Sequence, residues 1–509
     1  MSRVEQIINL LAGGFIFLFG SVLLVALVLY VIDRTQKTHT IRRNYPLIGR
    51  FRYLFEHLGE YFRQYFFAMD REELPFNRAQ RSWVYRAAKN VNNTIAFGST
   101  RDLTPEGTLI FANCAFPILD DEACAPSTIE YGPHCRHPFR TASFFNVSAM
   151  SYGSLSAPAI KALSHGANQA GSWLNTGEGG LSDHHMSGGC DIVFQIGTAK
   201  YGVRDENGNL SDDKLREVAA HPEVRMFEIK LSQGAKPGKG GILPAEKVTE
   251  EIARIRGIPA GKASISPNRH PEIDSPESLL DMVAHVREVS GKPVGFKSVM
   301  GDFEWFADLL REIRARGRES APDFITIDSA DGGTGAAPSS LMDYMGLTIQ
   351  EALPQVVNMI RDADLGDRIR VIASGKLLTP SLVAWALCTG AAAVNCGRGF
   401  MFALGCIQSL KCNENTCPTG IATHRKDLLK GLDPMTKAER VAHYATNMIK
   451  EVSVIARSCG VAEPRALNRT HARMVVDEYH SVSLEELYAK QGPVVLPPLP
   501  LRADHQQIG

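Results

Sequence analysis

Apolar and polar positions along most of the chain alternate between short β-rich runs and segments with helical spacing. From about residue 142, runs rich in β-branched and aromatic residues are separated by glycine-rich turns. The pattern predicts eight strands, at 144–150, 172–176, 191–197, 226–231, 293–299, 324–329, 370–374 and 392–397. Helices are predicted between them, including 247–256, 276–290, 303–316 and 380–389. This alternation is typical of an α/β fold, a (β/α)8 TIM barrel of parallel strands.

A doubly wound open sheet is the alternative architecture, and the positions of unusual polar residues decide between the two. In an open sheet such residues gather at one switch point, whereas in a closed barrel every strand end contributes to one mouth. Here they follow almost every strand, from Ser151 after the first to Arg398 after the last. The sequence therefore favours the closed barrel.

The first part of the chain is continuously apolar. Residues 7–32 carry no charge, and about 26 such residues are enough to span a bilayer of about 30 Å. A cleaved signal peptide is the alternative, but its apolar region is usually about 7–15 residues long. Cations concentrate after the run, at Arg34, Lys37, Arg42, Arg43 and Arg50. The positive-inside rule then predicts a single-pass protein of the cell inner membrane, with the rest of the chain in the reducing cytoplasm.

These patterns divide the chain into a transmembrane anchor at 1–33, a linker or N-terminal helical extension at 34–140, the barrel at 141–432, and C-terminal helices with a proline-rich tail at 433–509. The extension contains an amphipathic helix over 51–69, which lies either on the membrane surface or against the barrel domain. Docking against the domain is favoured because acidic residues interrupt the polar face. The tail, PVVLPPLPL, is expected to be extended.

Composition limits the class of protein without changing the fold assignment. Of 509 residues, 44% are hydrophobic and 22% are charged, and 55 Lys and Arg balance 55 Asp and Glu. These are the values of a globular protein, and zero net charge argues against a dedicated nucleic-acid binder. Ten cysteines are too few for a disulfide scaffold of this length.

Three cysteines are grouped closely enough to bind a metal. Cys406, Cys412 and Cys417 lie in GCIQSLKCNENTCPTG, where glycine and proline shape a loop. Three thiolates without a nearby fourth favour a three-iron cluster, and zinc with His424 as the fourth ligand is the alternative. Unligated buried thiols are a third interpretation. A more scattered set is expected to be buried and free: Cys114, Cys124 and Cys135.

Glycine-rich segments follow three late strands, namely DSADGGTGAAP at 328–338, ASGK at 373–376 and NCGRG at 395–399. Such segments let a ligand approach the backbone closely, and the phosphate sites of barrels commonly follow the seventh and eighth strands. Together they favour a phosphorylated cofactor. The chain has no G-x-G-x-x-G after a first strand, so a dinucleotide-binding Rossmann domain is not expected.

Lys230 and Lys297 lie inside apolar strand patterns, EIKL and GFKSV. A lysine at a strand end is partly desolvated unless it faces an anion, so these positions predict an acidic substrate or an anionic cofactor ring. Lys236, Arg256 and one carboxylate, Glu178 in NTGEGG, accompany them.

Several long motifs between about 140 and 430 resemble the synthase domain of glutamate synthase, in the short, membrane-anchored bacterial form described as FMN-binding glutamate synthase-like proteins. They include NVSAMSYGSLS, NTGEGG, QGAKPGKGG with LPAEKV, EEIARIRGIP, DGGTGA and the cysteine loop, in the family's order. The resemblance implies FMN in the barrel mouth and a [3Fe–4S] cluster on Cys406, Cys412 and Cys417. It also implies reductive amination of 2-oxoglutarate through 2-iminoglutarate, with electrons from ferredoxin or a reductase subunit.

The resemblance assigns roles to individual residues. Lys230 and Glu178 are expected to be catalytic, and the oxo acid is expected to contact Lys236, Arg256 and Gln233. The residues expected to bind FMN are Ala149, Met150, Ser151, Gln195, Lys297, Gly333, Gly375, Gly397 and Arg398. Among these, Lys297 is expected at the N1–O2 side of the ring, and the last three at the phosphate.

Two motifs depart from the family's pattern. PGEGGQ is replaced by PGKGGI, with Lys239 and Ile242, and PPPHHD is replaced by PNRHPE at 267–272. Losing one hydrogen-bonding side chain can change substrate preference by orders of magnitude. Two alternatives therefore stay open: a flavin and iron–sulfur oxidoreductase for another amino acid, amine or oxo acid, and a non-catalytic membrane subunit that relays electrons. Because Met1-Ser2 leads directly into the apolar run, a glutaminase domain that would supply ammonia is not expected.

Overall fold

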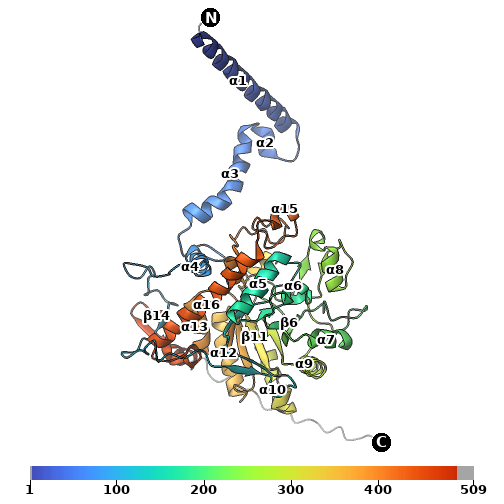
Figure 1. Cartoon of the computed structure of the whole chain (residues 1–509), viewed down its shortest axis with the longest axis vertical. Helices are drawn as coiled ribbons and strands as arrows, with labels where there is room; N and C mark the ends of the chain where they lie inside the picture. The colour runs from blue at the N-terminus through green and yellow to red at the C-terminus, as the bar shows by residue number, and fades with distance from the viewer. Residues whose placement is uncertain (1–2, 490–509) are drawn as a thin grey trace. The chain divides into compact units, whose positions relative to one another are not determined.

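Figure 1 shows the computed structural model, which describes residues 3–489. The chain divides into two units, with the boundary between Ala79 and Gln80. The proline-rich tail that was expected to be extended lies outside the described residues.

The first unit contains helices α1 (Arg3–Thr35), α2 (Thr40–Asn44) and α3 (Ile48–Phe62), followed by one π turn (Arg63–Phe67). Within the described chain, α1 is the one helix long and apolar enough to cross a membrane, and a signal sequence near the N-terminus would share these properties. The helix expected over 51–69 is present as α3 and the π turn. Its docking against the catalytic domain stays a prediction.

The second unit is built around a closed barrel of eight parallel strands, as the sequence alternation predicted. In barrel order these are β4 (Phe145–Val147), β5 (Leu174–Asn175), β6 (Ile192–Ile196), β7 (Val224–Lys230), β10 (Val294–Ser298), β11 (Phe324–Asp328), β12 (Arg370–Ser374) and β13 (Ala393–Cys396). β13 pairs in parallel with β4 and closes the sheet. Closure removes both sheet edges and rules out the doubly wound alternative.

Helices between the strands, and one after the last strand, surround the barrel (Figure 1). They are α5 (Ala157–Ala170), α6 (Asp183–Met186), α7 (Asp212–Ala220), α8 (Glu250–Arg256), α9 (Pro276–Ser290), α10 (Glu304–Arg316), α11 (Ser339–Met342), α12 (Ile349–Asp362), α13 (Pro380–Thr389) and α14 (Arg398–Leu404). The bounds of α9 were predictable because Ser275 caps its start and Gly291, at φ 70°, ends it. α8 begins three residues later than predicted, because Thr249 accepts a hydrogen bond from Ile252 N and caps the helix there.

The C-terminal segment differs from the expectation of helices alone. After α15 (Lys426–Leu429) and α16 (Pro434–Ser458), the chain forms β14 (Ala472–Asp477), β15 (His480–Ser483) and α17 (Leu484–Ala489). β14 pairs antiparallel with both β15 and β1 (Leu109–Phe111), which makes a three-stranded sheet outside the barrel. The sequence did not predict this sheet because its third strand is distant along the chain and too short to show a pattern of its own.

The amino ends of the barrel strands are closed by an antiparallel hairpin of β2 (Ile129–Tyr131) and β3 (Phe139–Thr141). The Tyr131 ring lies 5.9 Å from Trp173 and 6.0 Å from Phe324, measured between ring centroids. These side chains belong to one buried cluster with residues from the first halves of several strands. Because aromatic packing fills this end, the carboxyl ends form the open mouth, where the sites of such barrels lie.

We expect Asp323→Ala to destabilise the fold strongly. The carboxylate is fully buried, lies 3.1 Å from Arg287 Nε and 2.9 Å from Arg368 Nη2, and accepts a hydrogen bond from Val294 N at 2.8 Å. Removing it leaves partly and fully buried cations unpaired, which costs about 3–5 kcal/mol.

The free energy of unfolding in urea, followed by circular dichroism, measures this loss. The control is Asp308→Ala, which removes an ion pair with Arg311 in which the carboxylate is 47% exposed, and it should change stability by less than about 1 kcal/mol. Equal losses of unfolding free energy in the two variants would contradict the role of Asp323 as the partner of the two arginines.

Candidate active site

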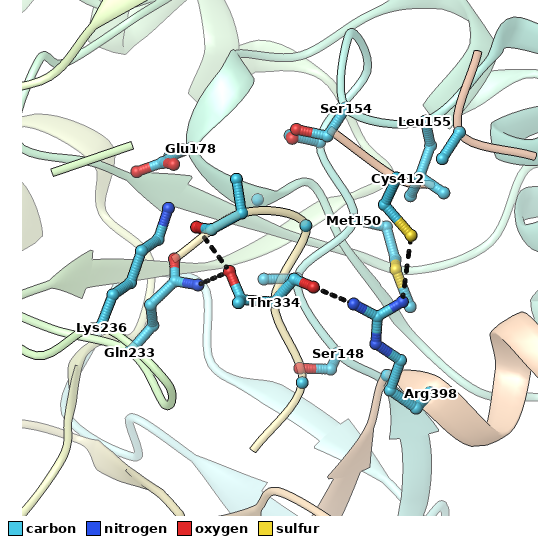
Figure 2. A pocket seen from close by; sticks show the side chains of 18 of the residues that line it. Ser148, Met150, Ser154, Leu155, Glu178, Gln233, Lys236, Thr334, Arg398 and Cys412 are labelled. Atoms are coloured by element: carbon cyan, nitrogen blue, oxygen red, sulfur yellow. Dashed lines mark hydrogen bonds between the residues drawn. The ribbon is translucent and has the colours of Figure 1, made fainter. Parts of the chain in front are cut away.

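The carboxyl ends of the barrel strands surround a cavity lined by side chains from almost every strand end (Figure 2). The predicted residues that line it are Ala149, Met150, Ser151, Glu178, Gln195, Lys230, Gln233, Lys236, Lys297, Gly333, Gly375, Gly397, Arg398 and Cys412. Three others, Arg256, Cys406 and Cys417, are not part of the lining. Lining residues that the sequence did not single out as site residues include Ser148, Ser154, Leu155 and Lys247.

An ion pair between Lys230, the last residue of β7, and Glu178, in the 3-10 turn Gly177–Gly179, lies on the polar side of the cavity. Lys230 Nζ lies 2.7 Å from Glu178 Oε2, and the two side chains are 8% and 17% exposed. Lys230 also donates to Gln233 Oε1. Burial raises the pKa of Glu178, but Lys230, Lys236 and Arg256 together lower it to about 2. Glu178 is therefore ionised at neutral pH.

Two glycines leave room for this carboxylate. A Cβ atom on Gly241 would lie 2.1 Å from Glu178 Oε1, and one on Gly197 would lie 2.6 Å from Glu178 Cβ. Real Cβ atoms do not approach other atoms so closely, so both positions require glycine while Glu178 keeps this conformation. QGAKPGKGG, which ends at Gly241, thus shapes the site around a residue more than sixty positions earlier in the chain.

Positive charge exceeds negative charge around the cavity. The lining contains six cationic side chains and two acidic ones: Lys230, Lys236, Lys247, Lys297, Lys376 and Arg398 against Glu178 and Asp328. Lys236 is 5% exposed, and its pKa is lowered to about 8, mainly by burial, with Glu178 opposing the shift. The imbalance favours an anionic ligand.

Lys297, on β10, faces Lys230 across the strand pair and is also 5% exposed. Within residues 3–489, its ammonium group has no hydrogen-bond or ion-pair partner. A buried cation in this state is costly unless an anion faces it.

Arg256 lies behind the ion pair and not in the cavity. Its guanidinium, at the end of α8, donates to Tyr152 O at 3.2 Å and to Ser264 Oγ at 3.5 Å. The side chain is 4% exposed and stacks over the Tyr201 ring at 5.2 Å. In this structure Arg256 supports Glu178 electrostatically, and it does not line the space in which it was expected to contact an oxo acid.

A buried carboxylate that the sequence analysis missed orients Gln195 from inside the barrel. Glu228, on β7, accepts hydrogen bonds from Gln195 Nε2 at 2.7 Å, Asn175 Nδ2 at 2.8 Å and Thr326 Oγ1 at 2.6 Å. Because the Gln195 amide nitrogen is engaged, its carbonyl oxygen is the atom left for the cavity. A signal was present in EIKL, where Glu228 precedes Lys230 by two residues and so shares its face of the strand.

His185, also missed, holds the backbone of Met150. Its Nε2 lies 2.9 Å from Met150 O, and its Nδ1 lies 2.7 Å from Ser182 Oγ and accepts from Ser182 N at 3.3 Å. Burial lowers the pKa of His185 to about 4. The ring is therefore neutral, with the proton on Nε2 donated to Met150 O.

The glycine-rich segments meet on one side of the cavity. Gly375 has φ 101°, and a Cβ atom there would lie 2.4 Å from Ser329 Cβ, so the β12 segment packs tightly against the β11 segment. Figure 2 shows Arg398, at the start of α14, between two groups: it donates to Thr334 O, and its Nη1 lies 3.9 Å from Cys412 Sγ. Arg398 thus connects the glycine-rich side of the cavity with the cysteine loop.

The cysteine loop borders the cavity through Cys412 and is held from two sides. Lys247 is 2% exposed and donates from Nζ to Ser154 O at 3.0 Å and Cys412 O at 3.1 Å. Tyr85, on α4 (Arg78–Ala88), donates to Cys406 O at 2.6 Å. The pKa of Cys406 is raised to about 11, first by burial, and Cys412 and Cys417 are close enough to add to this increase.

The structure favours neither of the two metal sites expected on the cysteine loop, and both stay predictions. No three His, Cys, Asp or Glu side chains in the described part of the chain are placed to hold one metal ion. His424, the candidate fourth ligand, places its Nε2 2.7 Å from Gly153 O.

The scattered cysteines are free, as expected, but the expectation that they are buried is wrong. Cys124 is exposed, and Cys114 and Cys135 are half-buried. Cys114 and Cys124 lie in the irregular segment before the barrel, and Cys135 lies in the turn between β2 and β3.

Comparison with known proteins gives one consistent family. Residues 116–462 match the family described as "Conserved region in glutamate synthase". The chain is 37% identical to the glutamate synthase large subunit-like protein YerD of Bacillus subtilis (strain 168), over 90% of this chain and 94% of that protein. It is 34% identical to the archaeal glutamate synthase (NADPH) of Methanocaldococcus jannaschii, over 64% of this chain and 61% of that protein. A mandelate oxidase crystal structure with (S)-4-hydroxymandelic acid covers 78% of this chain and 99% of its own, at 16% identity and a TM-score of 0.45, a likeness too weak to inform the site.

We expect Glu178→Gln to unfold more easily than the parent at pH 7, by about 3 kcal/mol, because Lys230 then stays buried without its carboxylate. The pKa of Glu178 is about 2 in the folded chain against an ordinary value of 4.5. Its contribution is therefore fully present above about pH 4.5 and is lost as the pH falls toward 2. Urea unfolding at a series of pH values should show the difference between parent and variant shrinking over this range.

Asp213→Asn is the matched control, since this carboxylate is 91% exposed in its pair with Arg216. It should show almost no difference from the parent at any pH. A Glu178→Gln deficit that stays constant down to pH 2 would contradict the ion-pair assignment.

Proposed function

Because the chain belongs to the glutamate synthase family, we propose that it is an FMN- and iron–sulfur-dependent oxidoreductase with glutamate-synthase-type chemistry. The expected reaction is reductive amination of 2-oxoglutarate: the oxo acid and ammonia form 2-iminoglutarate, and reduction of the imine carbon gives glutamate. The observation that best supports this proposal is the cationic cavity at the barrel mouth, with one lysine–glutamate pair at its polar side.

The lysines would bind the substrate carboxylates. Lys236 lies in the cavity near Glu178 without forming an ion pair within the described residues, so it is available to a ligand anion. Gln233 is held in place, since its Oε1 accepts from Lys230 and its Nε2 donates to Thr334 Oγ1 at 3.2 Å. This preorganisation reduces the cost of ordering side chains when the substrate binds.

Lys236 would act as the general acid, and Glu178 would position Lys230. With a pKa of about 2, Glu178 Oε2 stays ionised and serves to orient Lys230, not to deliver a proton. The pKa of Lys236, about 8, lies close to neutral pH, where a general acid works best. We assign to Lys236 Nζ the proton that the reacting nitrogen takes up.

FMN, when bound, would supply hydride-transfer chemistry at the imine carbon. The residues fit the group: Gln195 has its carbonyl oxygen free for a ring N–H, and the unpartnered Lys297 suits the electron-rich side of the ring. Ala149 and Met150 form an apolar wall, and His185 holds the Met150 backbone in place. The backbone at Gly333, Gly375 and Gly397, with Arg398 beside it, would receive the phosphate.

A [3Fe–4S] cluster is proposed on Cys406, Cys412 and Cys417. The donor set fits, because three thiols stand in one loop near Arg398, whose positive charge opposes the burial that raises the pKa of Cys406. When bound, the cluster would supply single electrons. Cys412 lines the cavity, so the cluster would lie beside the flavin site.

A second candidate function is favoured by one observation. Ile242, which stands where the family's motif has glutamine, lines the cavity, whereas Lys239 is exposed and does not. An apolar side chain at this wall suits a substrate with a less polar side chain than 2-oxoglutarate. The alternative is therefore the same cofactor chemistry on another amino acid, amine or oxo acid.

We also propose that α1 anchors the chain as a single-pass protein of the inner membrane, with the second unit in the cytoplasm. The support is the length and apolar character of α1 and the cations that follow it. Electrons would come from ferredoxin or a reductase subunit.

Anaerobic reoxidation of the reduced, full-length protein tests the function without requiring the natural donor. Flavin absorbance should return rapidly with 2-oxoglutarate plus ammonium and not with either alone. Faster return with another oxo acid would favour the second candidate, and a purified protein without flavin absorbance would exclude both.

Lys236→Gln should slow reoxidation about 100-fold or more at unchanged flavin content. The control Lys292→Gln changes a half-buried lysine outside the cavity lining and should leave the reoxidation rate unchanged.

Substitution of the loop cysteines tests the cluster separately. Cys406→Ser, Cys412→Ser and Cys417→Ser should each lose most of the bound iron and the cluster's paramagnetic resonance signal, because serine is a poor ligand for iron in such clusters. The control Cys124→Ser changes an exposed thiol and should keep full iron content. Iron retained in all three loop variants would argue against the assignment.

A further inference from the structure

The first unit presents an apolar face that nothing else in that unit covers. On α3, large side chains recur at helical spacing and are exposed, from 43% at Phe62 to 73% at Ile48, with Phe51 and Phe55 at 57% and 64%. The π turn extends the face with Phe66 and Phe67, which are 74% and 75% exposed. An exposed apolar patch of this kind marks an interaction surface.

The opposite face of α3 is polar. Arg50, Tyr53 and His57 lie on the far side of the helix from Phe55 by their spacing. His57 packs against Tyr61 with ring centroids 5.9 Å apart, and Arg42 lies 4.6 Å from the centroid of the Tyr53 ring. The helix is therefore amphipathic, with a distinct face for apolar contact.

A partly buried ion pair ties the start of α3 to the end of α1. Asp33 is 1% exposed and accepts hydrogen bonds from Arg50 Nε and Nη2, each at 2.8 Å, and from Leu47 N at 3.1 Å. Figure 1 shows that α3 does not continue the line of α1. If α1 crosses a bilayer, this contact holds the first turn of α3 at the bilayer surface.

The charge of the segment suits an anionic surface. Residues 34–55 contain no Asp or Glu and six cations, namely Arg34, Lys37, Arg42, Arg43, Arg50 and Arg52. Arg50 is paired with Asp33, which leaves five for other partners. Clusters of cations next to a membrane span bind anionic lipid headgroups, and aromatic side chains favour the interface between headgroups and acyl chains.

We propose that α3 and the π turn lie on the surface of an anionic bilayer, with the face of Phe51, Phe55, Phe62 and Phe66 inserted below the headgroups. This inference rests on the proposed anchoring by α1. It replaces the expected docking against the catalytic domain. Between Asp33 and Glu56, in the middle of α3, the chain has cations and no acidic residue, so the charge of this segment suits an anionic surface.

The test places a tryptophan on each face of α3 in the full-length chain. Phe55→Trp reports the apolar face and His57→Trp, two positions away, reports the polar face. The four native tryptophans lie in the second unit, and their signal is subtracted with the unmodified chain. Each protein is reconstituted in vesicles that contain phosphatidylglycerol, and quenching is measured with brominated lipid and with aqueous iodide.

Brominated lipid should quench Phe55→Trp several-fold more than His57→Trp, iodide should do the reverse, and lipid quenching should weaken in vesicles of phosphatidylcholine alone. Equal lipid quenching at both positions would overturn the proposal. So would a Phe55→Trp signal shielded from both quenchers, which is the result expected for docking on the second unit.

Flotation of the same vesicles tests the anchor, and a chain that does not float overturns both the anchor and the proposal. Flavin and iron content of the same preparation report on the catalytic function separately.

Discussion

Closure of the parallel sheet is the constraint on which the rest of this protein depends. Once β13 pairs with β4 and β7 with β10, all eight strands end at the same mouth, although their sequences are far apart. The aromatic plug of Tyr131, Phe139 and Trp173 fills the other end. The carboxyl ends are left open for a ligand site, and every strand contributes residues to it.

Buried carboxylates in this barrel are stabilised by several hydrogen-bond donors or counter-ions from neighbouring segments. Glu228 is buried in the barrel interior because three donors from neighbouring strands satisfy its oxygens. Asp323, immediately before β11, is balanced by Arg287 on α9 and by Arg368 in the loop before β12. At the mouth of the barrel positive charge remains in excess, since Glu178 offsets only part of the charge of the surrounding lysines. That residual positive charge is what suits the site to an anionic cofactor and an acidic substrate.

Much of the fold and part of the site followed from local pattern. All eight barrel strands were predicted near their observed positions, and α9 and α13 have the predicted bounds, because caps, glycines and apolar periodicity are local signals. Lys230 and Lys297 were singled out for their place in apolar strands, and both line the cavity. Arg256 was expected there too, but it stacks on Tyr201 behind Glu178. Glu228 and His185 were missed, since each acts through a partner that is distant in sequence.

The sequence by itself determined the order of strands and helices, the apolar first helix, the grouping of three cysteines and the family. These depend on neighbours within a few residues or on motifs with fixed spacing. The tertiary structure alone decided that β14 pairs with β1, that Glu178 pairs with Lys230 through the space left by Gly241, and that Arg398 reaches Cys412. Such pairings depend on distance and burial between segments that barrel closure brings together, and neither quantity exists until the chain has folded.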